Sequence, residues 1–410
     1  MTKPPSRGTV FLGFAEALSA PEAAWSLVEC GYEVVAFARK GRHSALRHSR
    51  FVTIREIQAP ELDYAESREQ LALEAEAIAT RCTPGTMALL PLDDASLFLA
   101  SGLASTSPAW KLAGPEGQCA ATALNKEMQV ERALEAGFPV PRCLAIHSSS
   151  DAYRLLPELG FPVILKTSDC APVRDGRIQK GRHWICANMQ EFESALSQWR
   201  ETGTLLLQQY FEGAGEGVFG IATPSGFGAW SAHRRLRMMN PHGSGSSACM
   251  SQPVSSDAKA SAERMLSGLG WQGLFMVEML RDRDGKLWFI ELNGRPWGSM
   301  ALSRRQGLEY PAWQVRLGLG EDPLGVSIPA MPPVICRHVG RELMHLLFVI
   351  RGRKSKAIQS WPGFWRSAMD MLKVGRQDRL YNWCPRDPMV FLSDCYYTLH
   401  DNLAKTGRAA

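Results

Sequence analysis

Short apolar runs alternate with amphipathic stretches over the N-terminal part of the chain. Residues 9–13 and 32–37 are apolar and predict two buried strands, with a helix over 20–30 between them. A further helix over 71–81 leads into a third apolar strand over 87–91. Strands that alternate with helices in this way are typical of a parallel sheet with right-handed crossovers.

The third strand leads to two adjacent carboxylates, Asp93 and Asp94. The carboxyl ends of parallel strands face the ligand crevice, so this pair either contacts a substrate or caps the following helix. The sequence leaves both interpretations open. The pattern changes near residues 108–117, and we predict an N-terminal α/β domain over residues 1–112.

A second unit is predicted over residues 113–325, with a small lobe at 145–207 and a larger sheet at 208–325. Its elements, in chain order, are a helix from Lys126 to Ala136, a strand over 160–166 that ends in Lys166, a polar loop over 168–182, a helix over 190–200, a strand over 204–210 and a helix over 257–269. The last segment, residues 326–410, is then a C-terminal extension with helices and many aromatic residues.

Two strand-like runs, over 274–280 and 286–293, flank the dipeptide Asp284-Gly285. Asp-Gly is a favoured pair for a two-residue hairpin turn. With this turn, Arg283 pairs with Lys286, and the register of both strands follows by counting outward. That register decides which side chains meet across the hairpin.

In this register Glu278 lies directly opposite Glu291, and Asn293 shares their face. Directly opposed β-carbons are about 4.5–5.5 Å apart, and two like charges at that separation destabilise a sheet. A Mg²⁺ ion bound by the carboxylates and the asparagine oxygen, with phosphate oxygens completing its shell, would neutralise them. A different register or a solvated face for the two carboxylates stays open as the alternative.

Three arginines near these strands are candidates for contacts with anions. Arg295 follows the second strand in a glycine-flanked segment, and its planar guanidinium suits carboxylate and phosphoryl oxygens. Arg235 and Arg237 alternate with His233 on one face of an earlier strand, where a solvated strand face is the alternative. We expect the glycine–serine loop at 241–247 to cover an acceptor site.

Composition narrows the picture. The chain has 410 residues, 45% of them hydrophobic, and a net charge of +5, which favours a globular protein and gives no warrant for a nucleic-acid binder. The ten cysteines are scattered without a C-x-x-C pair, which indicates reduced core residues rather than disulfides or a zinc site.

The chain also lacks the sequence features of a membrane-spanning or secreted protein. No run approaches the roughly 20 apolar residues that span a bilayer, and the N-terminus lacks the apolar stretch of a signal peptide. We therefore expect a cytoplasmic location. The apolar and then basic stretch at 343–356 is expected to pack on the domain, with contact to an anionic membrane surface as the alternative. The oligomeric state stays open, with a homodimer as one option.

In their order along the chain, these residues resemble the ATP-grasp superfamily, from about residue 110 to residue 320. The resemblance implies that Lys126 and Lys166 bind the phosphates of ATP. It implies further that Mg²⁺, or Mn²⁺ in its place, is bound by the three candidate metal ligands, Glu278, Glu291 and Asn293.

The resemblance also implies an adenine-binding strand and an acidic residue for the ribose hydroxyl groups. The adenine set is Gln208, Gln209, Tyr210 and Phe211. The ribose residue is Glu216, with Glu212 as the alternative. The loop after Lys166 departs from the family because it holds a single glycine, Gly176. The phosphate contacts of this loop are therefore expected from Arg174, Lys180 or Arg182.

The segment from Glu291 to Ser299 is similar to the carboxylate–amine ligase and carbamoyl-phosphate-synthase-like subset. This similarity implies a pre-ATP-grasp α/β domain before the ATP-grasp fold. It also implies an acyl phosphate that forms with release of ADP. We predict an ATP-dependent ligase that joins a small-molecule carboxylate to an amine, with Arg295, Arg235 and Arg237 as catalytic residues. A carboxylase-like or kinase-like reaction on a small acid and a non-catalytic ATP-binding scaffold are the alternatives.

Overall fold

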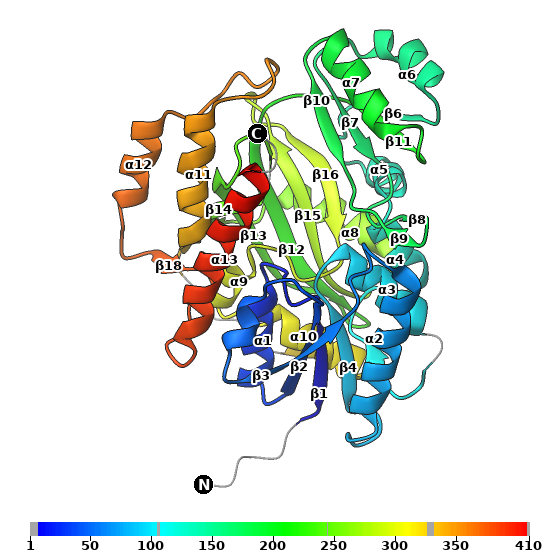
Figure 1. Ribbon diagram of the computed structural model, residues 1–410, viewed down its shortest axis with the longest axis vertical. Coiled ribbons are helices and arrows are strands. Elements are labelled where there is room, and N and C mark those ends of the chain that lie inside the picture. The colour runs from blue at the N-terminus through cyan, green and yellow to red at the C-terminus, as the bar shows by residue number, and fades with distance from the viewer. Residues whose placement is uncertain (1–6, 105–106, 244, 326–331, 408–410) are drawn as a thin grey trace.

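The computed structural model describes residues 7–104, 107–243, 245–325 and 332–407. Within these residues the strands form sheets of five, four and seven strands and one small two-stranded hairpin. In Figure 1 the five-stranded sheet lies at the bottom, the four-stranded sheet at the top right, and the seven-stranded sheet between them.

The five-stranded sheet is parallel, in the order β3-β2-β1-β4-β5. Its strands are β1 (Thr9–Gly13), β2 (Glu33–Arg39), β3 (Val52–Ile57), β4 (Met87–Pro91) and β5 (Lys111–Leu112), and its helices are α1 (Ala20–Glu29), η1 (Ala45–His48), α2 (Tyr64–Ala79) and α3 (Asp94–Ala104). The predicted parallel sheet is thus confirmed. The helix predicted over 71–81 begins earlier, because the Asp63 carboxylate accepts a hydrogen bond from the Glu66 backbone N–H at 2.9 Å and caps it.

The four-stranded sheet is antiparallel and belongs to the small lobe. Its strands, in the order β10-β7-β11-β6, are β10 (His183–Cys186), β7 (Val163–Thr167), β11 (Leu205–Gln209) and β6 (Cys143–Ile146). The helices of this region are α4 (Gly117–Ala123), α5 (Lys126–Glu135), α6 (Ser149–Leu155), η2 (Leu156–Glu158) and α7 (Met189–Trp199). The apolar side of α7 covers one face of the sheet through Phe192, Leu196 and Trp199.

A small hairpin, β8 (Val173–Arg174) and β9 (Arg177–Ile178), extends from this lobe and is called the lid hairpin below. It is attached to the N-terminal domain by two backbone hydrogen bonds. The Tyr64 N–H donates to the Gly176 carbonyl, and the Ile178 N–H donates to the Pro60 carbonyl, each at 2.7 Å. The lid hairpin therefore bridges two parts of the molecule.

The seven-stranded sheet has the order β16-β15-β12-β13-β14-β17-β18. Its strands are β12 (Ala214–Thr223), β13 (Gly226–Met238), β14 (Ser246–Gln252), β15 (Gly273–Arg281), β16 (Leu287–Asn293), β17 (Ile335–Arg337) and β18 (Asp378–Leu380). The last two strands come from the segment predicted as a helical and aromatic extension, so this segment completes the sheet. Of the predicted 241–247 loop, Ser246 and Ser247 lie in β14, and Ser244 lies outside the described residues.

Helices pack on both faces of this sheet: α8 (Ser256–Gly268) on one, and α9 (Met300–Arg305) and α10 (Tyr310–Gly318) on the other. A 3₁₀ turn, η3 (Pro323–Gly325), follows α10. On the first face, Met279, Phe289 and Leu292 are buried in the cluster that includes α8. Side chains at alternate positions of the same strands face the other side, and the candidate site lies there.

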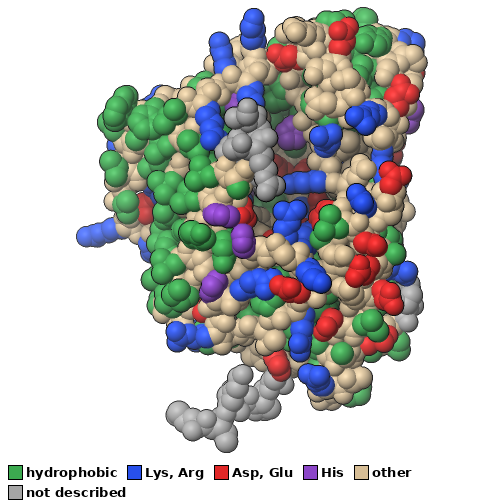
Figure 2. Space-filling model, in the orientation of Figure 1, with side chains coloured by type: hydrophobic (Ala, Val, Ile, Leu, Met, Phe, Trp, Pro, Cys, Tyr) green, Lys and Arg blue, Asp and Glu red, His purple; other side chains and the backbone are tan. Residues whose placement is uncertain are grey.

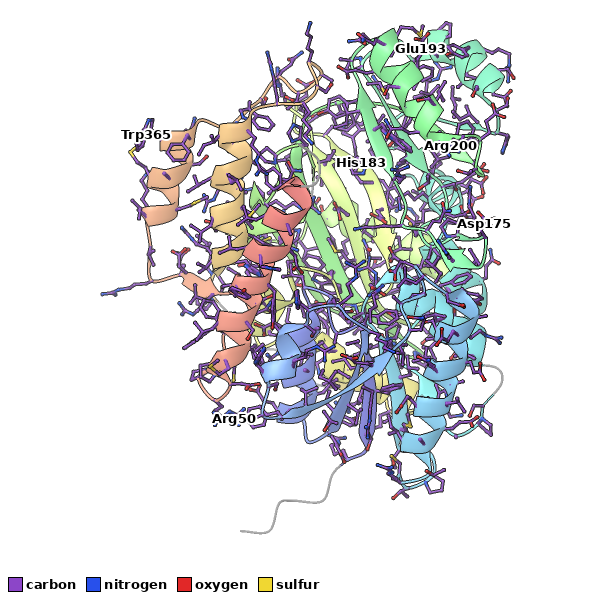
Figure 3. The ribbon with its side chains drawn as sticks, viewed as in Figure 1. Arg50, Asp175, His183, Glu193, Arg200 and Trp365 are labelled. Carbon is purple, nitrogen blue, oxygen red and sulfur yellow. The ribbon has the colours of Figure 1, made fainter. Side chains whose placement is uncertain are left out.

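The C-terminal helices are α11 (Val339–Arg351), α12 (Phe364–Leu372) and α13 (Pro388–Gly407). α11 buries Met344, His345 and Val349 against the domain. On α12, Trp365 is 77% exposed and points away from the molecule in Figure 3, at the edge where Figure 2 shows hydrophobic side chains gathered. All ten cysteines are free. Of the helices in the described ranges, none combines the length and the apolar character needed to cross a membrane.

Candidate nucleotide and metal site

The hairpin of β15 and β16 places Glu278 directly across from Glu291. The predicted two-residue turn was wrong, however. The Asp282 N–H donates to the Lys286 carbonyl at 3.0 Å, so the loop contains three residues, 283–285. Gly285 lies in this loop with a φ of 86°, a conformation that glycine adopts without steric cost.

A bulge compensates for the longer turn. Beyond the loop, Met279 pairs with Phe289, whereas Glu278 pairs with Glu291, which leaves Ile290 as an extra residue in β16. The longer loop shifts the pairing by one position and the bulge shifts it back. The two glutamates therefore face each other as the sequence predicts, although one assumption behind the prediction fails.

Each of these carboxylates is paired with a cation. Arg235 on β13 donates to Glu278 through Nη2, and Lys126 lies with its Nζ 3.1 Å from Glu291 Oε1. Lys126 Nζ also contacts the Cys170 thiol at 3.0 Å. Burial lowers the pKa of Lys126, but Glu291, Cys170 and Asp94 together outweigh this effect and the net shift is upward, so the ammonium stays charged.

The position of Lys126 is fixed by the start of α5. The Asn125 carboxamide oxygen caps this helix by accepting from the Met128 N–H at 3.0 Å, and its nitrogen donates to Asp169 at 2.8 Å. The Lys126 N–H donates to the Ser168 carbonyl at 2.9 Å. These bonds join the first turn of α5 to the loop after β7. The backbone of Lys126 is therefore fixed by both α5 and this loop.

Lys166 is brought to the same cleft by the small lobe. It pairs with His183 across β7 and β10, so the two side chains share a face of that sheet. Burial lowers the pKa of Lys166, and although Cys143 raises it, the Lys126 ammonium lowers it further. Figure 3 shows His183 facing the space between the small lobe and the large sheet, and Figure 2 shows that space as a hollow containing Lys and Arg side chains. His183 was not predicted, because the polar residues before it indicate a loop.

Two glycines in β12 make room for the side chains of β13 on the cleft face. A Cβ atom at Gly215 would lie 2.6 Å from Arg235 Cδ, and one at Gly217 would lie 3.1 Å from His233 Nε2. Gly217 stands between His233 and Glu278 across the sheet. The alternation of glycines in Gly213-Ala214-Gly215-Glu216-Gly217 is the sequence signal for this clearance.

His233 is a neutral part of this face. It is completely buried, burial lowers its pKa to about 3, and the nearby Arg235 guanidinium acts in the same direction. Its Nδ1 lies 2.9 Å from the Ser299 hydroxyl. The imidazole therefore positions its neighbours and carries no charge at neutral pH.

The two aspartates at the end of β4 have separate partners. Asp93 caps α3 by accepting from the Ser96 N–H at 2.8 Å, and it also accepts from Arg39 Nη2 at 2.9 Å. Asp94 accepts from Arg295 Nε at 2.6 Å. Although burial raises the pKa of Asp94, Arg295 outweighs it and the net shift is downward, so this carboxylate stays ionised. Arg295 thus joins the N-terminal domain to the hairpin strand that carries Glu291.

Two predicted residues are not brought to this cluster. Glu216 faces the side of the sheet covered by α8, where it accepts from Arg281 Nε at 2.7 Å and from Gln252 at 2.8 Å. The sequence analysis placed Glu216 in the site because the sequence does not show the register between β12 and its neighbouring strands. Arg237 is likewise occupied elsewhere, since its Nη2 donates to Glu342 on α11 at 2.7 Å.

Two of the four predicted adenine residues, Tyr210 and Phe211, line a second pocket. Gln208 is 4% exposed at the end of β11. Tyr210, Phe211 and Glu212 line a pocket of about 280 Å³ beside the loop that joins β15 to β16. Glu212 accepts from the backbone N–H groups of Gln359 and Ser360. Of the two candidates for the ribose residue, Glu212 is the one next to this pocket.

Comparison with known proteins identifies the domain that carries these residues. The family model described as the ATP-grasp domain matches residues 131–303. Residues 131–303 thus carry an ATP-grasp domain. The match covers β7, β15 and β16 and ends inside α9, so the opposed glutamates lie within the ATP-grasp domain.

Curated relatives match only part of the chain. A segment of 166 residues, 39% of this chain, is 29% identical to the carbamoyl phosphate synthase large chain of Deinococcus radiodurans and covers 16% of it. A segment of 177 residues is 23% identical to D-alanine–D-alanine ligase of Ectopseudomonas mendocina and covers 51% of it. The chain thus spans about half or less of the length of each relative.

A solved structure matches over a longer range. The ADP complex of N5-carboxyaminoimidazole ribonucleotide synthetase superposes with a TM-score of 0.64 at 15% identity. The match covers 91% of this chain and 98% of that one. The ATP-grasp fold with a preceding α/β domain, predicted from the sequence, is therefore confirmed.

Proposed function

We propose that this protein is an ATP-dependent ligase that activates a small-molecule carboxylate as an acyl phosphate and passes the acyl group to an amine. The observation that carries the proposal is the pairing of Glu278 with Glu291 on the cleft face of the ATP-grasp domain. Two opposed carboxylates destabilise a sheet unless positive charge compensates them. The cleft supplies that charge from residues far apart in the chain.

The residues on this face suit a magnesium ion bound to nucleotide. Glu278, Glu291 and Asn293 offer oxygen ligands from adjacent strands, and Mg²⁺ prefers hard oxygen ligands together with phosphates. Among the described residues, each glutamate has one cationic side-chain partner, Arg235 for Glu278 and Lys126 for Glu291. Because those partners are a guanidinium and an ammonium, they can transfer from carboxylate to phosphate oxygens when a nucleotide enters.

The remaining residues divide the tasks of binding and positioning. Lys126 and Lys166 bind phosphate oxygens, and Tyr210 and Phe211 border the base. ATP would supply the phosphoryl group, and a Mg²⁺ ion held by Glu278, Glu291 and Asn293 would neutralise the charge that develops during transfer. Arg295, held by Asp94, is oriented to bind the substrate carboxylate at the junction with the N-terminal domain. Positioning and charge neutralisation then account for most of the rate enhancement.

The reaction balances without a covalent enzyme intermediate. A carboxylate oxygen of the substrate attacks the γ-phosphorus of ATP, and ADP leaves. The amine nitrogen then attacks the acyl carbon, inorganic phosphate leaves, and the proton lost by the nitrogen passes to phosphate or solvent. The partial match to D-alanine–D-alanine ligase supports a reaction of the ligase class.

Product analysis tests the proposal. Purified protein is incubated with Mg²⁺, ATP and pools of amino acids and other carboxylates, and ADP release and new masses are recorded. We expect ADP formation that requires both an acid and an amine, together with a mass equal to their sum minus water. Formation of AMP would contradict the acyl-phosphate route.

A carboxylase-like or kinase-like reaction on a small acid is the second candidate. The long superposition on N5-carboxyaminoimidazole ribonucleotide synthetase favours it, because it covers nearly all of both chains. The two candidates differ in their requirements. ADP release that needs no amine, with incorporation of labelled bicarbonate or a stable phosphorylated product, would support the second candidate over the first.

A further inference from the structure

A cavity of about 600 Å³ lies on the small lobe, away from the cleft. Its walls are the lid hairpin, the residues that follow it, and the C-terminal end of α7. Thr167 and Trp184 line it, whereas their strand neighbours Lys166 and His183 face the cleft. Because side chains alternate along a strand, the cavity and the cleft lie on opposite faces of the four-stranded sheet. Figure 3 labels Asp175 and Arg200 on the outer side of this lobe.

Positive charge dominates the cavity wall. Four cationic side chains line it against one acid, Asp175. The four are Arg174, Lys180, Arg182 and Arg200. Within the described part of the chain none of these four side chains makes a hydrogen bond or an ion pair, and Arg182 contacts only the face of the Trp184 ring, at 5.6 Å. By contrast, two arginines nearby are paired, Arg154 with Asp151 and Arg142 with Glu158.

A buried donor without a partner borders the same cavity. Trp199 is 2% exposed, and its indole N–H has no hydrogen-bond acceptor among the described residues. Buried indole N–H groups normally find an acceptor, since an unsatisfied donor costs free energy. The neighbouring Trp184 shows the usual situation, because its N–H donates to the Gln198 side chain at 3.2 Å. The cavity thus combines an unpartnered indole donor with four cations, and Asp175 is the one acid among its lining residues.

The end of α7 does not account for these charges. A helix C-terminus carries about half a negative charge, which one nearby cation balances. Only Arg200 belongs to that helix end, as its C-cap, while the other three cations come from the lid hairpin and the residues after it. The carbonyls of the last turn are also occupied: Leu196 accepts from the Arg200 N–H and Trp199 from the Thr202 hydroxyl.

We propose that this cavity is a second anion site, which binds a small molecule carrying two or more phosphate or carboxylate groups. The site goes beyond the proposed ligase reaction and does not depend on it. An anion there would pair with Arg174 and Arg182 on one side and Arg200 on the other, and it would accept from the Trp199 N–H. Since these residues come from the lid hairpin and from α7, the bound anion ties the lid to the small lobe.

Calorimetric titration of the full chain with inorganic tripolyphosphate, at fixed ionic strength, tests the site. We expect the double variant Arg174→Gln/Arg200→Gln to weaken tripolyphosphate binding at least about tenfold, because each lost charge-assisted contact is typically worth that factor or more. The single variant Arg200→Gln, at the end of α7 and outside the lid hairpin, leaves the affinity for Mg·ADP unchanged. Arg154→Gln is the matched control, an exposed arginine of the same lobe that does not line the cavity.

Two further variants separate this site from the cleft. Trp199→Phe keeps an aromatic ring and removes only the N–H donor, so it weakens tripolyphosphate binding without affecting Mg·ADP. Lys126→Met does the reverse. Tripolyphosphate binding that the double variant leaves intact, or that Lys126→Met alone abolishes, would overturn the proposal, because the anion would then be in the cleft. Loss of Mg·ADP binding in unmodified protein would instead count against the proposed function.

Discussion

The two faces of the large sheet each carry a glutamate–arginine pair, and the pairs differ in how fully they are satisfied. On the α8 side, Glu216 is 4% exposed and accepts from Arg281 Nε, Arg281 Nη2 and Gln252. On the cleft side, Glu278 accepts from one nitrogen of Arg235 and faces a second carboxylate, Glu291.

The difference separates a buried carboxylate that stabilises the fold from buried carboxylates that can still bind a ligand. The acceptor oxygens of Glu216 already have donors, so no ligand is needed to explain its burial. Glu278 and Glu291 each keep lone pairs free, and each repels the other. A divalent cation that binds between them would relieve this repulsion and use the remaining lone pairs of both carboxylates.

Removing one charge from the cleft pair gives the largest expected effect on activity. Glu291→Gln keeps the size of the side chain and removes a metal ligand and the partner of Lys126. We expect ADP formation to fall at least about 100-fold, the scale seen when a preorganised electrostatic contact is removed. Steady-state ADP release measures it. Activity within a few fold of the wild type would refute the role of this carboxylate.

Loss of the Lys126 ammonium has the next largest effect. Lys126→Met keeps the length of the side chain, and without the ammonium a phosphate loses one charge-assisted contact in a buried setting. We expect Mg·ADP to bind about 10–100-fold more weakly. Calorimetry measures the affinity, and Lys259→Met, an exposed lysine on α8, is the control. Equal affinities for both variants would contradict the assignment.

The same substitution on the opposite face sharpens the comparison. Glu216→Gln removes the charge that binds Arg281, and we expect the free energy of unfolding to fall by about 1–3 kcal/mol, the cost of a broken charge-assisted hydrogen bond. ADP release stays near the wild-type rate. Glu278→Gln should have the opposite pattern. It relieves the repulsion between the carboxylates and so does not lower the free energy of unfolding in the same way, but it removes a metal ligand and so lowers the rate of ADP release. Urea unfolding and ADP release on both variants separate the two roles.

The smallest expected effect is a pH dependence from Lys166. Burial lowers its pKa, so this ammonium loses its proton at a lower pH than an exposed lysine. Nucleotide affinity therefore falls as the pH rises through that lowered pKa, by up to about tenfold per pH unit. The contribution of Lys166 to the free energy of unfolding rises over the same pH range, because the buried charge that destabilises the native state is lost.

Calorimetric affinities from neutral to alkaline pH measure this dependence. Lys166→Arg should flatten the profile, since a guanidinium stays protonated throughout. A profile that is the same for the lysine and the arginine would assign the titration to another group.

The hairpin shows how much of the site could be predicted from the sequence. The alternation in both strands and the Asp-Gly turn signal correctly predicted that Glu278 and Glu291 meet. The turn length was wrong and the bulge at Ile290 was not anticipated, and the two errors cancelled. A bulge has no strong local signature. Close to this one, the Leu292 backbone is bonded to the Gln129 side chain of α5, a long-range contact that local pattern does not predict.

The assignment of Glu216 failed for a different physical reason. Which face a strand residue occupies depends on the register with its neighbours, and β12 is paired with β15 across a large sequence separation. The glycines on either side of Glu216 carried the missing information, since they leave space for Arg235 and His233 on the cleft face. His183 and the cavity behind the lid hairpin depend on tertiary packing alone, so no local pattern predicted them.

A crystal structure of the full chain with Mg²⁺ and a non-hydrolysable ATP analogue tests the central claim most directly. We predict a Mg²⁺ ion that contacts carboxylate oxygens of both Glu278 and Glu291 and the side-chain amide oxygen of Asn293. We also predict that Lys126 and Arg235 move from these carboxylates to phosphate oxygens. An ion bound elsewhere, with both glutamates still paired to their present cations, would contradict the account.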